Sequence, residues 1–133
     1  MREIKFRVWD KCRKKYNEDS YEKNELISVA LGFNSDVCVS KNDLILQQYT
    51  GLLDKNGKEI YEGDILQPTL HDKCISDVVY NEGSFRIHYN HATIMDKDEL
   101  VKIPDRNCFY FLKDHCNLSI IMGNIFENSD LLK

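Results

Sequence analysis

The stretch Gln48–Leu66 decides how this chain folds, and it reads Gln-Tyr-Thr-Gly-Leu-Leu-Asp-Lys-Asn-Gly-Lys-Glu-Ile-Tyr-Glu-Gly-Asp-Ile-Leu. It holds three of the six glycines in the 133 residues, and its Asn56–Gly57 dipeptide lies between apolar segments. Glycine readily adopts the positive φ angles that tight turns require. The stretch therefore predicts a β-hairpin, a second turn at Glu62–Asp64 and a new strand from Ile65 that ends at Pro68.

Two turn types fit the Asn-Gly dipeptide, and they pair different residues. A two-residue loop would set Lys55 opposite Lys58, and Asp54 opposite Glu59. Like charges directly opposite each other destabilise a strand pair. A three-residue loop that ends at Gly57, with Gly57 in the left-handed conformation, sets Asp54 opposite Lys58 instead. We predict the three-residue loop because it pairs opposite charges.

Short apolar segments continue on both sides of this hairpin. In Glu3–Trp9, the residues Ile4, Phe6 and Val8 alternate with polar ones, which predicts a strand with one face in the core. Trp9 falls on the polar face and suggests a covering segment or a subunit interface there. The further predicted strands are Leu26–Leu31, Asp43–Tyr49, Ser76–Tyr80, Ser84–Tyr89, Cys108–Leu112 and Leu118–Phe126.

The remaining segments predict turns, loops and little helix. Asn81–Gly83 joins two strands as a hairpin turn, with Val79 and Ile87 on one face. The polar stretch Asp10–Glu25 predicts a loop. Capping-box spacing at Asp96–Glu99 predicts a helical turn over Lys97–Val101, and the tail 127–133 predicts another short helical turn.

Seven or eight short strands at close turn spacing, with little helix, determine the fold class. This pattern favours a mainly β protein, α+β at most, built as an antiparallel barrel or sandwich rather than from βαβ units. We predict a smaller N-terminal β layer over residues 1–44 and the barrel over residues 45–133.

Charge is unevenly distributed along the chain. Residues 1–15 hold seven basic and two acidic side chains, whereas the rest holds 11 basic and 20 acidic ones. Such a basic segment could bind nucleic acid, or it could pack against an acidic surface of its own or a neighbouring subunit. Both interpretations remain open at this stage.

The sequence also indicates a cellular compartment. Its first ten residues alternate polar and apolar, unlike a signal peptide, and no window approaches the about 18 apolar residues of a membrane-spanning helix. The five cysteines are an odd number and predict reduced thiols rather than a disulfide framework. We expect a cytoplasmic protein without membrane contact.

Three blocks of residues carry a family resemblance. They are Arg2–Asp10, Gln48–Ile65 and Met122–Asn128. In this order and spacing they closely resemble the YopX family of phage and prophage proteins. The resemblance implies an SH3-type small barrel in the C-terminal part, and it brings no established enzymatic activity, cofactor or set of functional residues.

The match to the family pattern is incomplete. Residues 16–43 and 67–118 carry no matching motif. Leu53 stands where the family usually has Lys, Met122 where it usually has Ile, and Ser129 where it usually has Pro. The last departure bears on how the C-terminal tail is held.

Two groups of side chains could hold a metal ion. The carboxylates of Asp54, Glu59, Glu62 and Asp64 could bind a divalent cation for phosphoryl-transfer chemistry, but cap and turn roles explain them equally. A zinc site could draw on the thiol and imidazole groups, although the Cys-x-x-Cys spacing typical of structural zinc is absent. The candidates are His71, Cys74, His88, His91, Cys108, His115 and Cys116. We predict no metal and no cofactor, with Cys38 and Cys108 as core thiols.

Neither a nucleophile elbow nor a phosphate-binding glycine loop occurs in the sequence, so we predict a non-enzymatic protein. Small barrels often present aromatic and basic side chains to peptides or single-stranded nucleic acid. We predict a phage or prophage accessory protein that binds a protein partner, including a second copy of itself. Nucleic-acid binding is the alternative, and a metal-dependent hydrolase is third. The predicted contact residues are Arg7, Trp9, Arg13, Lys14, Glu59, Tyr61, Glu62 and Tyr89.

Overall fold

The computed structural model describes residues 3–17, 20–33, 40–68, 75–96 and 99–132, with the side chains of 20–22 and 89–108 outside the description. The chain divides into two compact units, residues 1–49 and 50–133, and each is described by itself. This boundary lies five residues beyond the predicted one, because a single strand runs from Leu44 to Leu53 across both positions.

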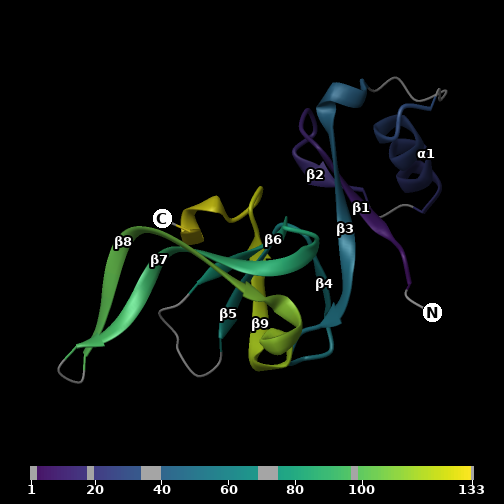
Figure 1. Ribbon diagram of the computed structural model, residues 1–133. Coiled ribbons are helices and arrows are strands. Elements are labelled where there is room, and N and C mark those ends of the chain that lie inside the picture. The colour runs from purple at the N-terminus through teal and green to yellow at the C-terminus, as the bar shows by residue number, and fades with distance from the viewer. Residues whose placement is uncertain (1–2, 18–19, 34–39, 69–74, 97–98, 133) are drawn as a thin grey trace. The chain divides into compact units, whose positions relative to one another are not determined.

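Nine strands and one α-helix make up most of the described chain (Figure 1). The strands are β1 Phe6–Asp10, β2 Lys15–Tyr16, β3 Leu44–Leu53, β4 Glu59–Tyr61, β5 Asp64–Pro68, β6 Ser76–Asn81, β7 Ser84–Asp96, β8 Glu99–Phe111 and β9 Ser119–Asn124. The helix is α1 Ser20–Ala30, and the 3-10 helices are η1 Lys41–Asp43, η2 Leu112–Asp114, η3 Cys116–Leu118 and η4 Ser129–Leu132. The predicted mainly β class is confirmed, as is the helical turn in the tail.

Unit 1 packs α1 on a small antiparallel sheet. Strand β1 lies between β2 and β3 and pairs with both. Val8 from β1 and Leu44 from β3 form a buried cluster with Leu26 and Val29 of the helix. Ile4 precedes the strand and is exposed, so its predicted place in the core is wrong.

The helix corrects two sequence predictions. Leu26–Leu31 was predicted as a strand and Asp10–Glu25 as a loop, but α1 runs from Ser20 to Ala30 and so covers the end of the loop and nearly all of the strand. Leu26 and Val29 are three positions apart and so share one helical face. At the helix end, Gly32 donates its N–H to the Val29 carbonyl and Phe33 donates to Ser28, at 2.9 and 2.8 Å. This is a Schellman motif, in which Gly32 with φ +94° ends the helix.

The predicted three-residue hairpin loop is confirmed in unit 2. Asp54 N–H donates to the Lys58 carbonyl at 2.8 Å, and Gly57 N–H donates to the Asp54 carbonyl at 3.0 Å. Gly57 has φ +79°, the left-handed conformation expected of it. The second turn is built as predicted as well, because Gly63 has φ +85° and β5 begins at Asp64.

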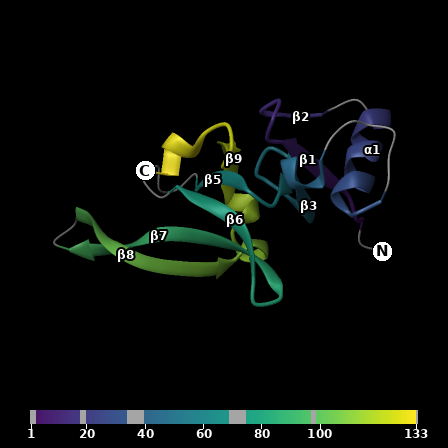
Figure 2. The same ribbon diagram turned by 90° about the horizontal axis from the view of Figure 1, so that it is seen from above.

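Unit 2 is built on a curled five-stranded antiparallel sheet with the order β8-β7-β6-β5-β9, an arrangement that fits a small SH3-type barrel (Figure 2). Strand β9 returns to pair with β5 after two short 3-10 helices. The core of this unit contains Ile60, Leu66, Val78, Ile87 and Leu112.

Two further predictions fail within this sheet. Val78, not Val79, pairs with Ile87 and shares its buried face, because the two-residue loop Glu82–Gly83 fixes the register one position away from the predicted one. Both loop residues have positive φ, as a type I′ turn requires. Position 97 lies outside the described residues, but Glu99–Val101 of the predicted helical turn belong to β8 and pair with β7, because cross-strand pairing outweighs the local capping pattern. None of the described helices is long and apolar enough to cross a membrane.

Candidate binding surfaces

The carboxylates of the central stretch stabilise turns. Asp54 is only 6% exposed, and its Oδ1 accepts the N–H groups of Asn56 and Lys58 at 2.9 and 2.8 Å. Its Oδ2 accepts Ile121 N–H of β9 at 3.1 Å. Asp64 Oδ2 accepts the N–H of Tyr61 at 2.8 Å. Among the described residues, no three acidic, His or Cys side chains come together as metal ligands.

The candidate zinc ligands are only partly described. His71 and Cys74 lie outside the described residues, as does Cys38, and so do the side chains of His91 and Cys108. Of the others, His88 Nδ1 lies 2.9 Å from Asp77 Oδ1, and the buried Cys116 thiol lies 3.7 Å from the Lys113 carbonyl oxygen. The His115 ring contacts the edge of Tyr110, with ring centroids 5.7 Å apart.

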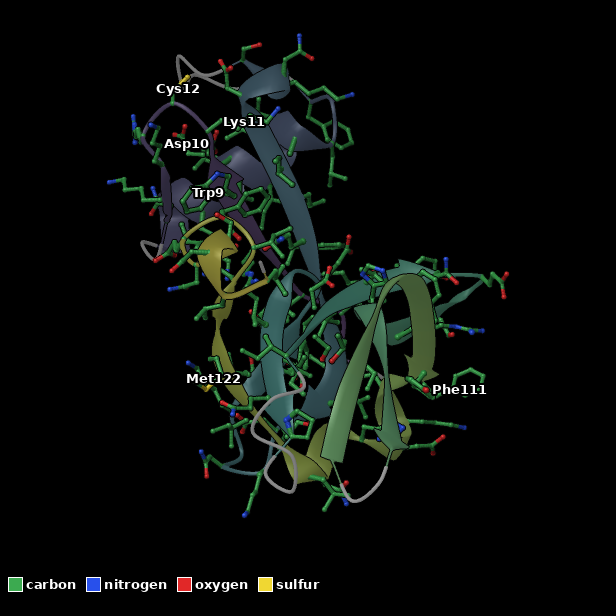
Figure 3. All side chains as sticks on the ribbon, turned by 90° about the vertical axis from the view of Figure 1, so that its left-hand side faces the viewer. Trp9, Asp10, Lys11, Cys12, Phe111 and Met122 are labelled. Atoms are coloured by element: carbon green, nitrogen blue, oxygen red, sulfur yellow. The ribbon has the colours of Figure 1, made fainter. Side chains whose placement is uncertain are left out.

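The basic N-terminal residues form a compact turn between β1 and β2. Buried Asp10 Oδ1 accepts the N–H groups of Cys12 and Arg13 at 2.9 and 3.1 Å, and Arg13 Nε lies 3.7 Å from Asp10 Oδ2. Lys11 donates from its Nζ to the Asn42 carbonyl at 3.1 Å. Lys14 has φ +54° and is exposed, so the turn presents basic side chains on a fixed backbone. In Figure 3, Cys12 lies at its tip.

The Cys12 thiol lies beside two carboxylates. The negative charge of Asp43 raises the pKa of Cys12, and some loss of hydration, a hydrogen bond to Asp43 and the charge of Asp10 raise it further. A raised pKa keeps the thiol protonated at neutral pH, and the thiolate is the reactive form. Cys12 is therefore poorly suited to act as a nucleophile.

Trp9 and Arg7 both contact residues of unit 1. Trp9 is 6% exposed and contacts Tyr16 edge-on, with ring centroids 5.0 Å apart. Arg7 lies over the same Tyr16 ring at 4.6 Å, and its Nε donates to Gln47 Oε1 at 2.8 Å. Of the two alternatives that the position of Trp9 suggested, β2 supplies the covering segment, and this leaves little of Trp9 for the contact role predicted for it.

Three further predicted contact residues, Glu59, Tyr61 and Glu62, are half-buried. Tyr61 donates its hydroxyl hydrogen to Glu59 Oε2 at 3.3 Å, and Glu62 precedes the glycine of the second turn. The side chain of Tyr89 lies outside the described residues. Whether these residues contact a partner stays a prediction.

The structure reveals a different exposed aromatic surface, on the outer side of β7 and β8. Phe109 is 38% and Phe111 47% exposed. In the register, His88 pairs with Phe109 and Arg86 with Phe111, so all four share the face opposite the buried Ile87. We call Arg86, His88, Phe109, Phe111 and Lys113 the aromatic face. Figure 3 shows Phe111 pointing away from the ribbon.

Local contacts order the aromatic face. Arg86 lies over the Phe111 ring at 4.7 Å and Lys113 lies over it at 5.8 Å, while His88 stacks on Phe109 with centroids 4.8 Å apart. Rings held by cations and stacking are fixed before a partner arrives, which lowers the entropy cost of binding. The Glu82–Gly83 turn was a sequence signal for one half of this face, because it sets the register that turns Arg86 and His88 away from the core. The pairing of β7 with β8 then places Phe109 and Phe111 on the same side.

Comparisons with known proteins place the chain in a family. The sequence model of the YopX protein family matches residues 5–133, nearly the whole chain. The chain belongs to the YopX family. The crystal structure of protein EF1440 from Enterococcus faecalis has a similar fold to this YopX protein, with a TM-score of 0.55 and 23% identity over 100% of both chains. At that identity the similarity concerns the fold alone. No curated protein matches the sequence.

Proposed function

We propose that this YopX protein is a non-catalytic, phage-encoded accessory protein of the host cytoplasm that acts by binding a protein partner through the aromatic face. One observation carries the proposal: Phe109 and Phe111 are exposed side by side on one sheet face, and Arg86 and Lys113 lie over the Phe111 ring. Aromatic residues and arginine are enriched at protein interfaces and dominate their binding energy.

The charge of unit 2 favours a protein over a nucleic acid at this face. Residues 50–133 hold nine basic and fourteen acidic side chains. An acidic body repels the phosphate backbone, whose neutralisation supplies most of nucleic-acid affinity. The basic side chains of the aromatic face instead suit a protein surface that offers apolar side chains and a few carboxylates.

Affinity capture from infected or lysogenic host cells tests this function. Immobilised wild-type protein is compared with the double variant Phe109→Ala/Phe111→Ala and with Tyr80→Ala. Tyr80 is a matched control because it is an aromatic side chain, 58% exposed, on β6 of the same sheet. We expect the wild type and Tyr80→Ala to retain the same protein, and the double variant to lose it. Equal retention by all three would refute the assigned face.

A second candidate function rests on the turn between β1 and β2. Lys11, Arg13, Lys14 and Lys15 are exposed on a backbone that Asp10 fixes, which suits contacts to phosphates. Binding of a fluorescent single-stranded oligonucleotide at rising salt tests it. The double variant Arg13→Glu/Lys14→Glu should weaken binding and flatten its salt dependence, and unchanged binding would exclude this turn as the site.

A further inference from the structure

The five-stranded sheet of unit 2 ends in two edge strands, and the structure treats them differently. At the β9 edge, Lys55 N–H donates to the Ser119 carbonyl at 2.9 Å, and Ile121 N–H donates to Asp54 Oδ2 at 3.1 Å. The hairpin loop thus occupies the backbone groups of β9. At the β8 edge, β7 is the only strand of the described chain that pairs with β8.

The direction of the β8 backbone groups follows from hydrogen bonds elsewhere in the sheet. Gly63 N–H donates to the Val78 carbonyl at 2.8 Å, so Val78 turns its backbone groups away from β7. Its partner Ile87 therefore points its own groups toward β8, where it pairs with Tyr110. Alternate residues of a strand bond to opposite sides. The N–H and C=O of Phe109 and the N–H of Phe111 consequently point away from β7, in the plane of the sheet, at its open edge.

Only a short part of this edge is open to a partner strand. Pro104 lacks an N–H group, and a register shift between Tyr89 and His91 interrupts the pairing of β7 with β8 beside it. Proline and irregular pairing are features that protect edge strands from unwanted partners. The segment Cys108–Phe111 has neither a proline nor an irregular pairing, and it contains Phe109 and Phe111, the two exposed rings of the aromatic face.

We propose that a second copy of this chain adds its own β8 to this edge, antiparallel and centred on Phe109. The proposal rests on the proposed function in that it names the partner and the binding mode of the aromatic face. A two-fold axis beside Phe109 sets Phe109 of one copy opposite Phe109 of the other. Each then donates its outward N–H to the other's C=O, so both outward backbone groups of each Phe109 are hydrogen-bonded. The two Phe109 rings then lie on one face as a cross-strand aromatic pair.

The open segment carries no charge that would repel a second copy. The same two-fold sets Cys108 opposite Tyr110 and position 107, an uncharged residue in the sequence, opposite Phe111. Like charges directly opposite each other would destabilise a strand pair, and two copies of this segment bring none together. Because the open edge is short, the interface belongs to the weak and transient class, which forms at micromolar protein concentration.

Sedimentation equilibrium of the full chain over about 10 to about 500 µM protein tests the dimer. We expect the wild-type mass to rise from 15.6 kDa toward twice that value. Phe109→Lys places a charge at the edge and should raise the dissociation constant at least about tenfold. Phe109→Pro removes the outward N–H and should raise the dissociation constant by a similar factor. The fold should survive this change, because proline is tolerated at edge strands. Tyr80→Lys adds the same charge elsewhere and should leave the dissociation constant unchanged.

Two results would overturn this inference. The first is a wild-type mass that stays at 15.6 kDa over the whole range, and the second is a dimer weakened equally by Tyr80→Lys and Phe109→Lys. Circular dichroism of each variant shows that it is folded. A monomeric wild type that still captures a host protein through Phe109 and Phe111 would refute the dimer alone and leave the proposed function standing.

Discussion

The β9 and β8 edges of one sheet differ in whether their backbone groups already have hydrogen-bond partners. The β9 edge is closed by Asp54 and Lys55 of the central hairpin loop, which occupy its backbone groups. The β8 edge ends in a regular segment with Phe109 and Phe111 exposed beside it. The most recognisable stretch of the sequence, Gln48–Leu66, therefore stabilises the fold. Binding is expected instead at Cys108–Phe111, where the sequence has no family motif.

The largest effect should come from opening the closed edge. Asp54→Ala removes an acceptor for three backbone N–H groups, those of Asn56, Lys58 and Ile121. Leaving such groups unsatisfied should lower the free energy of unfolding by about 3 kcal/mol. Urea unfolding followed by fluorescence measures it.

Lys58→Ala is the control for that change, because the Lys58 side chain is exposed and Asp54 bonds to the backbone N–H and carbonyl of Lys58, which the substitution keeps. It should cost no more than about 0.5 kcal/mol. A loss in Asp54→Ala no larger than in Lys58→Ala would show that the loop does not close the β9 edge.

A smaller loss should follow from crowding β9 itself. A Cβ on Gly123 would collide with the Asn128 side chain, whose Oδ1 accepts the Asn124 N–H at 3.2 Å. Gly123→Ala should therefore cost about 2 kcal/mol through overpacking and the lost bond. Gly57→Ala meets no atom within 4 Å and should cost about 1 kcal/mol from its positive φ alone. Thermal melting of both variants checks the order, and the reverse order would contradict it.

Substitution at the open edge should have the smallest effect on stability. Phe111→Ala removes the ring under Arg86 and Lys113, with an expected cost of about 1 kcal/mol, measured by urea unfolding. Phe109→Lys should change the free energy of unfolding by about 0.5 kcal/mol or less, although we expect it to weaken self-association at least about tenfold. A loss of stability at Phe109 as large as at Asp54 would mean that this edge also stabilises the fold.

The elements set by local turn chemistry were predictable from sequence. Left-handed Gly57 set the three-residue loop, and Gly63 with Asp64 set the start of β5. These features depend on a few adjacent residues and on the φ preference of glycine. The mainly β class followed from the same turn spacing.

The parts that depend on distant contacts were not predictable. The apolar run after Glu25 suits a strand or a helix, and only packing on β1 and β3 selects α1. Trp9 is buried because β2 covers it, and β2 was not predicted because the residues around it are polar. The outward position of Phe109 and Phe111 in the predicted strand Cys108–Leu112 was not predictable either, because a one-position change of register reverses which side chains face outward.

Amide hydrogen exchange at two protein concentrations tests the central claim most directly. The Ile121 N–H, which donates to Asp54, should be protected at low and high concentration alike. The Phe109 N–H should exchange rapidly when the protein is dilute and become protected when it is concentrated, as a second β8 pairs with it. A Phe109 amide as protected as that of Ile121 in dilute protein would contradict the account.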